Sequence, residues 1–320
     1  MQIRSSPSTV WPAVLTVIIL PLLVITALTL GRDAQGWYWA TGELANQLLP
    51  WRLPRIMAAA VSGMLLGAAG CLIQRLTGNP MASPEVLGIS SGAACGVVVM
   101  LFMVPGDAWQ WLIPAGTIGA LLTLLLIVAV GGRGGVSPQR MLLAGVSLSA
   151  LFSTLILLFM ASGDPRIAGL MTWLSGSTYQ VDMPQARRVT MVGAALLLLI
   201  PLGFRWLTLL PLGEITARAS GVPLMPARLL LLLLAAALTA TATFITGPLS
   251  FIGLMAPHLA RMLGFYRITS QLTMAVLLGA GIMIIADWCG RMIFFPDQIP
   301  AGLLATFIGA PYFIWLLRRV

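Results

Sequence analysis

The sequence contains ten long stretches of apolar residues, and their length constrains the fold more than any other feature. A helix rises about 1.5 Å per residue, so about 20 apolar residues cross the ~30 Å hydrocarbon core of a bilayer. Of the 320 residues, 59% are hydrophobic and only 8% are charged. A soluble domain of this length has too small an interior for so many apolar side chains. The pattern predicts membrane-spanning helices at 11–31, 56–74, 86–105, 112–131, 138–160, 187–209, 227–246, 249–265, 270–289 and 301–317.

These stretches predict an all-α polytopic membrane protein with about ten transmembrane helices, in which residues 1–320 form one transmembrane domain. The first stretch is longer than the apolar run of a signal peptide and no small-residue cleavage site follows it, so we expect it to remain as a helix. With the N-terminus inside, the cytoplasmic connections hold 11 of the 18 arginines and the outer connections hold 7. Basic residues favour the cytoplasmic side, so both termini are predicted to be cytoplasmic.

The charged and sulfur-containing residues exclude several classes of function. The net charge is +9, but the arginines are scattered between apolar stretches, so no nucleic-acid surface is expected. All 18 basic residues are arginine, and without lysine there is no Walker A phosphate site. Any ATP hydrolysis must therefore occur on another chain. Neither a metal site, a cofactor motif nor a catalytic constellation is suggested by Cys71, Cys95, Cys289 and the single histidine, His258.

Two cytoplasmic connections are polar and differ from ordinary loops. The first, 74–85, contains an Asn-Pro break followed by a Ser-Pro-Glu helix start. The second, 212–223, predicts a short helix in which Glu214 and Arg218 pair four residues apart and Gly221 ends the helix. A short exposed helix suits docking into the groove of a partner, although a solvated loop helix has the same composition.

A third polar group is expected on the outer side. Asp287 and Arg291, four residues apart, are predicted to lie on one helical face at the end of a span. Arg52 and Arg55 precede the second span on the same side. Guanidinium groups suit bidentate capture of carboxylates on a docking protein, and local ion pairing is the alternative.

These segments resemble the iron–siderophore and vitamin B12 importer permeases. The likeness covers nearly the whole chain in order, and its nearest match within the family is the C-terminal half of the double-length permeases for ferric hydroxamates. It rests on Arg52-Leu53-Pro54-Arg55, on GNPMASPEVLGISSGA at 78–93, on GPLSFIGLMAPH at 247–258, on 287–291 and on 299–313.

The resemblance implies a permease subunit, not an enzyme, of an ABC importer in the bacterial inner membrane. Its expected cargo is a ferric siderophore, with ferric hydroxamates as the expected class, and ATP hydrolysis takes place on a partner chain. The chain would be one half of a two-unit permease, paired with a homologous half or subunit. Its other implied partners are an ABC ATPase dimer, a periplasmic siderophore-binding protein and membrane lipid, with no cofactor and no nucleic acid.

The resemblance also implies roles for individual residues. Segment 212–223 corresponds to the coupling helices of the family, so contact with the ATPase is expected of Gly213, Glu214, Ala217, Arg218 and Gly221. Docking of the binding protein is expected of Arg52, Arg55 and Arg291. Serines in the fifth stretch either line the translocation path or pack helices; these are Ser147, Ser149 and Ser153.

An ion-coupled secondary transporter of a small solute is the alternative function. Such proteins normally carry buried ionisable residues near the middle of the membrane. The interiors of the predicted spans hold almost no Asp or Glu, which favours the importer permease.

Overall fold

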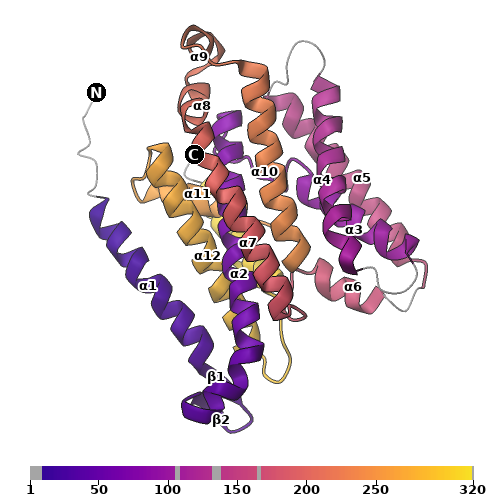
Figure 1. Cartoon of the computed structure of the whole chain (residues 1–320), viewed down its shortest axis with the longest axis vertical. Coiled ribbons are helices and arrows are strands. Elements are labelled where there is room, and N and C mark those ends of the chain that lie inside the picture. The colour runs from indigo at the N-terminus through magenta and orange to yellow at the C-terminus, as the bar shows by residue number, and fades with distance from the viewer. Residues whose placement is uncertain (1–8, 105–108, 132–137, 164–166, 319–320) are drawn as a thin grey trace.

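The structure is a computed structural model and describes residues 9–104, 109–131, 138–163 and 167–318. It is a bundle of helices with a small hairpin at one end and a short helix, α9, at the other (Figure 1). The elements are α1 (Val10–Thr29), β1 (Leu30–Asp33), β2 (Gly36–Trp39), α2 (Gly42–Thr77), α3 (Ile89–Met103), α4 (Trp109–Gly131), α5 (Pro138–Met160), α6 (Ile167–Leu174), α7 (Met183–Leu199), α8 (Phe204–Leu209), α9 (Glu214–Ala219), α10 (Leu224–Thr246), α11 (Ile252–Met262), α12 (Ile268–Met292) and α13 (Ala301–Leu317).

Helix α2 forms the centre of the bundle. It packs against α7, α10, α11 and α12, and glycines on α2 allow these helices to approach closely. A Cβ atom on Gly63 would overlap the backbone carbonyl of Gly279 on α12, and one on Gly70 would overlap that of Gly253 on α11. Small residues at such crossings are typical of helices that associate in lipid, where close backbone contact replaces the hydrophobic drive of water.

All ten predicted stretches contain helix, but not all of these helices are long enough to cross a membrane. Among the described residues, six candidate spans are found in α1, α2, α5, the 183–212 segment, α10 and α12. Three shorter apolar helices lie at Ile89–Met103, Pro114–Val130 and Ala301–Ile314. The eighth predicted span, 249–265, contains only the 11-residue α11, which is about 16 Å long. The structure therefore shows a polytopic helical protein but not ten full-length spans.

The prediction of a purely helical chain is wrong for residues 30–39. Here β1 and β2 form a two-stranded antiparallel hairpin. The Asp33 carboxylate closes the turn by accepting the backbone N–H groups of Gln35 (2.8 Å) and Gly36 (3.0 Å). The Trp-Tyr-Trp run of β2 has the aromatic composition that favours strands, and this signal was overlooked because the segment lies between two apolar stretches.

The second and sixth predicted spans have different bounds in the structure. Helix α2 begins at Gly42 rather than at residue 56, because Pro50 and Pro54 are accommodated inside it although proline normally interrupts a helix. The 187–209 stretch begins earlier, at Met183, and a 3₁₀ turn containing Pro201 separates α7 from α8. The short helix α6 was not predicted.

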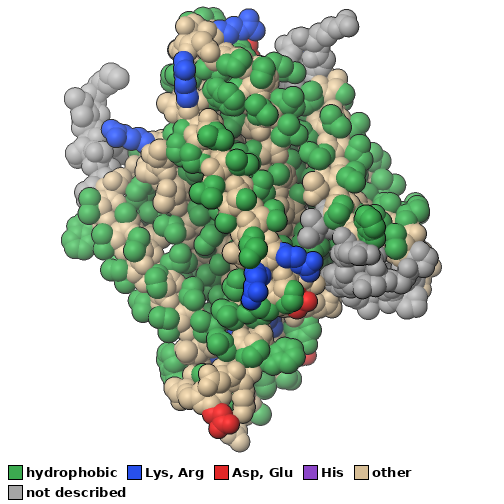
Figure 2. Space-filling view, viewed as in Figure 1, with side chains coloured by type: hydrophobic (Ala, Val, Ile, Leu, Met, Phe, Trp, Pro, Cys, Tyr) green, Lys and Arg blue, Asp and Glu red, His purple; other side chains and the backbone are tan. Residues whose placement is uncertain are grey.

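The outer surface of the bundle is apolar, as a lipid environment requires. Hydrophobic side chains cover most of the face drawn in Figure 2, whereas the few basic side chains lie toward its upper end and over the lower part of α7. Only 6% of the apolar window of α1 is buried within the chain, so this helix lies at the periphery.

Candidate functional site

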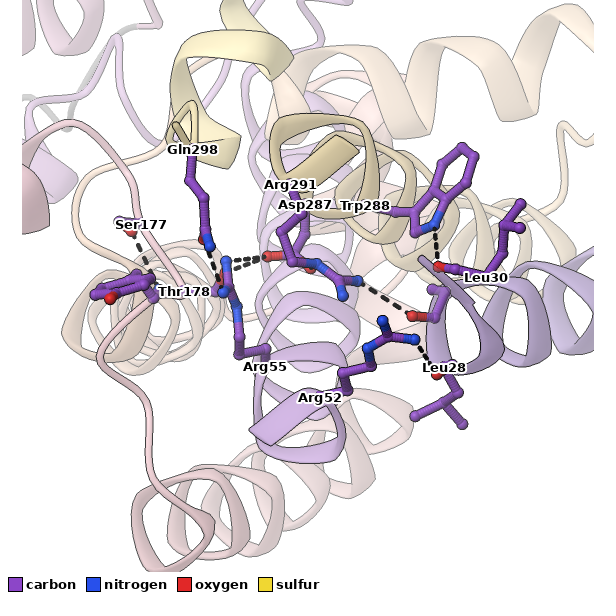
Figure 3. A network of polar contacts seen from close by, with 12 residues as sticks. Leu28, Leu30, Arg52, Arg55, Ser177, Thr178, Asp287, Trp288, Arg291 and Gln298 are labelled. Carbon is purple, nitrogen blue, oxygen red and sulfur yellow. Dashed lines mark hydrogen bonds and ion pairs between the residues drawn. The ribbon is translucent and has the colours of Figure 1, made fainter. Parts of the chain in front are cut away.

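A buried polar network lies where α2 and α12 approach the hairpin. At its centre is Asp287 on α12, whose side chain is 2% exposed. Its carboxylate accepts a hydrogen bond from Arg291 Nε at 3.0 Å and one from the hydroxyl of Thr178, and it forms an ion pair with Arg55 at 3.6 Å (Figure 3). The predicted pairing of Asp287 with Arg291 on one helical face is confirmed.

The three arginines predicted to dock a binding protein are brought together by this network. Arg52 donates to the carbonyl of Leu28 (2.7 Å) and to the Tyr38 hydroxyl (2.9 Å). Arg55 donates to Gln298 Oε1 at 2.9 Å. Arg291 reaches the carbonyl of Ala27 at 3.3 Å. The network thereby joins α2 and α12 to the end of α1 and to two connecting segments.

The arginines also line a cavity, but they are less exposed than the sequence suggested. Arg52 is 8% exposed and Arg291 7%, because their guanidinium groups are bonded to the chain itself. The cavity has a volume of about 550 Å³, and Arg32 and Asp182 line it together with all three of these arginines. Because four arginines and a single aspartate line this cavity, its positive charge suits it to an anionic group. Docking at these arginines stays a prediction.

The short helix predicted at 212–223 is present as α9, at the opposite end of the bundle (Figure 1). Gly221 ends it as predicted, with φ +77°. The backbone N–H of Gly221 bonds to the carbonyl of Arg218, and that of Val222 to the carbonyl of Ala217, which together form a Schellman motif.

The predicted ion pair within this helix is wrong. Glu214 pairs with Arg228 on α10 at a distance of 2.9 Å, and no ion pair joins it to Arg218 in the described part of the chain. The helix has only six residues, so a partner on the longer, adjacent α10 competes well with an i,i+4 neighbour. The Glu214–Arg228 pair fastens α9 to α10.

Of the residues predicted to contact the ATPase, Ala217 is buried and the others are exposed. Two further exposed residues of this segment were not predicted. Ala217 is buried, so it positions the helix and is not available to a partner. Leu212 and Ile215, which were not predicted, are 60% and 87% exposed. A leucine and an isoleucine within an otherwise polar segment were the available signal, because a hydrophobic groove binds the apolar side chains of a docked helix.

The three serines predicted to line the path do not lie together. Ser149 is turned toward the 78–88 connection and donates to the carbonyl of Glu85 at 3.3 Å. Ser147 and Ser153 are exposed on α5, and Ser147 bonds to the carbonyl of Leu143 in its own helix. A path along α5 stays a prediction.

Within the described residues no group of three or more His, Cys, Asp or Glu side chains could hold a metal ion. Cys71 and Cys95 are buried among apolar residues, and Cys289 is partly exposed. The His258 ring lies edge-on to Tyr312, with ring centroids 6.1 Å apart. Cys71 and Cys95 belong to the hydrophobic clusters of the bundle.

Sequence comparison relates the chain to one family. The sequence pattern of the FecCD transport family matches residues 12–319. The chain is 61% identical over 302 residues to the iron(3+)-hydroxamate import system permease protein FhuB of Escherichia coli (strain K12), a match that covers 94% of this chain and 46% of that protein. The chain therefore spans about half the length of the FhuB proteins that it matches.

Shorter proteins match over most of their own length. The achromobactin transport system permease protein CbrC of Dickeya dadantii (strain 3937) is 38% identical over 279 residues, which cover 84% of this chain and 77% of that protein. The ferric enterobactin transport system permease protein FepG of Escherichia coli (strain K12) is 36% identical over 278 residues, with coverages of 83% and 81%.

Solved structures have the same fold. One, an inward-facing conformation assigned to the metal-chelate type of ABC transporter, has a TM-score of 0.84 at 28% identity and covers 99% of this chain and 100% of that chain. PsaBC from Streptococcus pneumoniae in complex with Fab has a TM-score of 0.65 at 23% identity, covering 84% of this chain and 92% of that one. This second likeness concerns the fold alone.

Proposed function

Because the chain belongs to the FecCD transport family, we propose that it is a permease unit of an ABC importer that moves ferric siderophores across the bacterial inner membrane. Ferric hydroxamates are the proposed cargo, and a separate ATPase supplies the energy. The observation that carries this proposal is the 61% identity to an iron(3+)-hydroxamate permease over 94% of the chain. The apolar bundle with polar structures at its two ends is the geometry that such a unit needs.

The proposed complete permease contains a second, homologous unit. This partner is needed because the chain has about half the length of the FhuB proteins. Helix α5 is the proposed contact. Among exposed leucines such as Leu143 and Leu157, it carries small and hydroxyl side chains that suit close helix packing or a polar path. These are Ser147, Ala150, Ser153 and Thr154.

Uptake in cells tests the proposal. The chain is expressed with its second unit, an ATPase and a binding protein in a strain that lacks hydroxamate uptake, and entry of radioactive iron as a ferric hydroxamate is measured. We expect uptake that requires this chain and stops when cellular ATP is depleted. Uptake of ferric catecholates but not of hydroxamates would refute the proposed cargo. Uptake that follows the proton gradient instead of ATP would identify an ion-coupled secondary transporter.

Contact with the ATPase is proposed at α9. Leu212 and Ile215 present an apolar surface, while the Glu214–Arg228 pair and buried Ala217 fix the helix against the bundle. Gly213 and Gly221, with φ values of +99° and +77°, allow the chain to turn sharply at both ends of the helix. Through these contacts a displacement of α9 would be passed on to α10.

Docking of a periplasmic binding protein is proposed at the 550 Å³ cavity. The internal bonds of Arg52, Arg55 and Arg291 hold their guanidinium groups in place before a partner arrives, which lowers the entropic cost of binding an acidic side chain. Arg55 is the most available of the three, with its side chain 14% exposed. A single R55Q substitution is therefore expected to weaken binding-protein affinity without unfolding the permease.

Ten membrane segments and cytoplasmic termini are retained as the proposed topology. In this arrangement the hairpin and the Asp287 network face the periplasm, and α9 faces the cytoplasm. The excess of arginine on the α9 side supports it. The shorter helices α3, α11 and α13 would then be enclosed by longer helices of the two units.

A further inference from the structure

Two arginines on α7 lie outside every polar contact described above. Arg187 and Arg188 are exposed in the first two turns of this helix. The only hydrogen bond of either side chain in the described part of the chain is from Arg188 Nε to the carbonyl of Pro184, at 3.4 Å. The neighbouring acid, Asp182, caps the helix by accepting the backbone N–H of Gln185 at 2.7 Å. Neither arginine lines the 550 Å³ cavity.

The surface that continues from these arginines is apolar. Successive residues of a helix are rotated by about 100°, so Arg187 and Arg188 share one face with the exposed side chains that follow them. Basic side chains over the lower part of α7 adjoin hydrophobic surface in Figure 2. The exposed apolar side chains of this face are Met191, Val192, Ala194, Ala195, Leu198, Leu199 and Leu202.

The composition of this face points to lipid rather than to another helix. Apart from Ala194 and Ala195, its side chains are large, and they hinder the close backbone approach that helix pairs in membranes achieve with small residues. The exposed surface of α5 is more mixed, because Ser147, Ala150, Ser153 and Thr154 lie there beside exposed leucines such as Leu143 and Leu157. Guanidinium groups at the boundary of a lipid-covered face reach the headgroup layer and bind phosphate through two parallel hydrogen bonds.

We propose that Arg187 and Arg188, with the apolar face of α7 beside them, form a binding site for an anionic phospholipid. The two guanidinium groups bind the headgroup phosphate, and the acyl chains lie along the side chains from Met191 to Leu202. Binding at this site is independent of the cargo, so it can be tested separately from transport.

Native mass spectrometry of the full chain, purified in detergent, measures the binding. The probes are dioleoylphosphatidylglycerol, which is anionic, and dioleoylphosphatidylcholine, which has no net charge. We expect a preference for phosphatidylglycerol. An arginine near an anionic headgroup contributes about fivefold in affinity, so either single change, R187Q or R188Q, should weaken binding about fivefold and the double change on the order of 25-fold.

Matched variants separate this site from general charge effects. R267Q removes an exposed arginine at the start of α12. It should leave the affinity of the Arg187–Arg188 site for phosphatidylglycerol unchanged. The R187K/R188K variant keeps both charges and should retain most of the preference for phosphatidylglycerol. Glycerol 3-phosphate has the phosphate without acyl chains and should not displace the lipid.

Three results would overturn the proposal. The first is a wild-type chain that binds the two lipids equally, or an R187Q/R188Q variant that binds phosphatidylglycerol as tightly as the wild type does. The second is displacement by glycerol 3-phosphate at the concentration at which the lipid itself binds. The third is cross-linking of a cysteine at Met191 to a second permease unit in membranes, which would make this face a protein interface.

Discussion

The Asp287 carboxylate is the residue on which the outer polar network depends. It contacts Arg55 on α2, Arg291 on its own helix and Thr178 in the connection before α7. Removing charged groups from water has a large cost, and a buried ion pair offsets it only while both partners are present. The loss of this one carboxylate would leave the buried Arg291 and the partly buried Arg55 without their anion.

Replacing Asp287 with asparagine should therefore destabilise the protein. We expect D287N to lower the free energy of unfolding by about 3–5 kcal/mol, measured as a lower melting temperature of the chain in detergent. D297N removes an exposed carboxylate from the nearby connection and should change the melting temperature little. Equal melting temperatures for D287N and the wild type would show that the network contributes no stability.

Sequence reasoning found part of this network, and the reason is local geometry. Asp287 and Arg291 are four residues apart, so helical periodicity alone places them together. Arg55 and Thr178 reach the same carboxylate from segments more than 100 positions away in the sequence. No short-range pattern encodes such a contact, because it depends on how α2 and α12 pack.

Helix α9 is held at one end of the bundle so that its exposed aliphatic side chains face outward. Ile215 is 87% exposed while Ala217 is buried, so the two faces of this short helix have separate roles. If a partner groove encloses Ile215 as a hot spot of the interface, removing this contact costs about 2 kcal/mol or more, on the order of 30-fold in affinity.

The I215D substitution should consequently disrupt coupling without unfolding the permease. We expect it to lower affinity for the ATPase about 30-fold or more and to abolish siderophore uptake, with an unchanged melting temperature. T216A, at the exposed position beside it, is the control and should retain uptake. Normal uptake by I215D would exclude Ile215 as a contact with the ATPase.

The crossing of α2 and α12 depends on the absence of side chains at two facing glycines. A methyl group on Gly63 would overlap the Gly279 carbonyl, so G63A should force the helices apart and destabilise the protein by about 1–3 kcal/mol. Gly281 lies two residues farther along α12, and its added Cβ would find its nearest neighbour at 3.8 Å. G281A should leave the melting temperature nearly unchanged. Equal effects of the two substitutions would contradict close packing at this crossing.

At the scale of elements, apolarity predicted where helices occur but not how far each one extends. Helix α2 continues 14 residues before the predicted start, through Pro50 and Pro54, because tertiary contacts outweigh the local cost of proline. The helix in the eighth predicted span, α11, is too short to cross the membrane. The span was predicted because apolar composition marks a helix buried by its neighbours as well as one that faces lipid. The hairpin at 30–39 does not follow from apolarity, because it lies between two apolar stretches and its strand signal is the short aromatic run of β2.

The whole molecule is longer than the membrane is thick, and this separates its two polar ends. Helix α2 has 36 residues and is therefore about 54 Å long, whereas the hydrocarbon core measures ~30 Å. The hairpin precedes the first end of α2, and α9 lies at the far end of the bundle (Figure 1). In the proposed topology the hairpin and α9 therefore face opposite aqueous compartments.

Accessibility labelling in cells shows which compartment each end faces. Gln35, in the hairpin turn, and Thr216, on α9, are both exposed, and each is replaced singly by cysteine. The C289A substitution removes the partly exposed native thiol from the background. Because arginines accumulate on the α9 side, a membrane-impermeant maleimide should label Q35C from the periplasm and T216C only after the inner membrane is opened. Labelling of T216C in intact spheroplasts would reverse the orientation, and α9 would then be unable to reach an ATPase that hydrolyses cytoplasmic ATP.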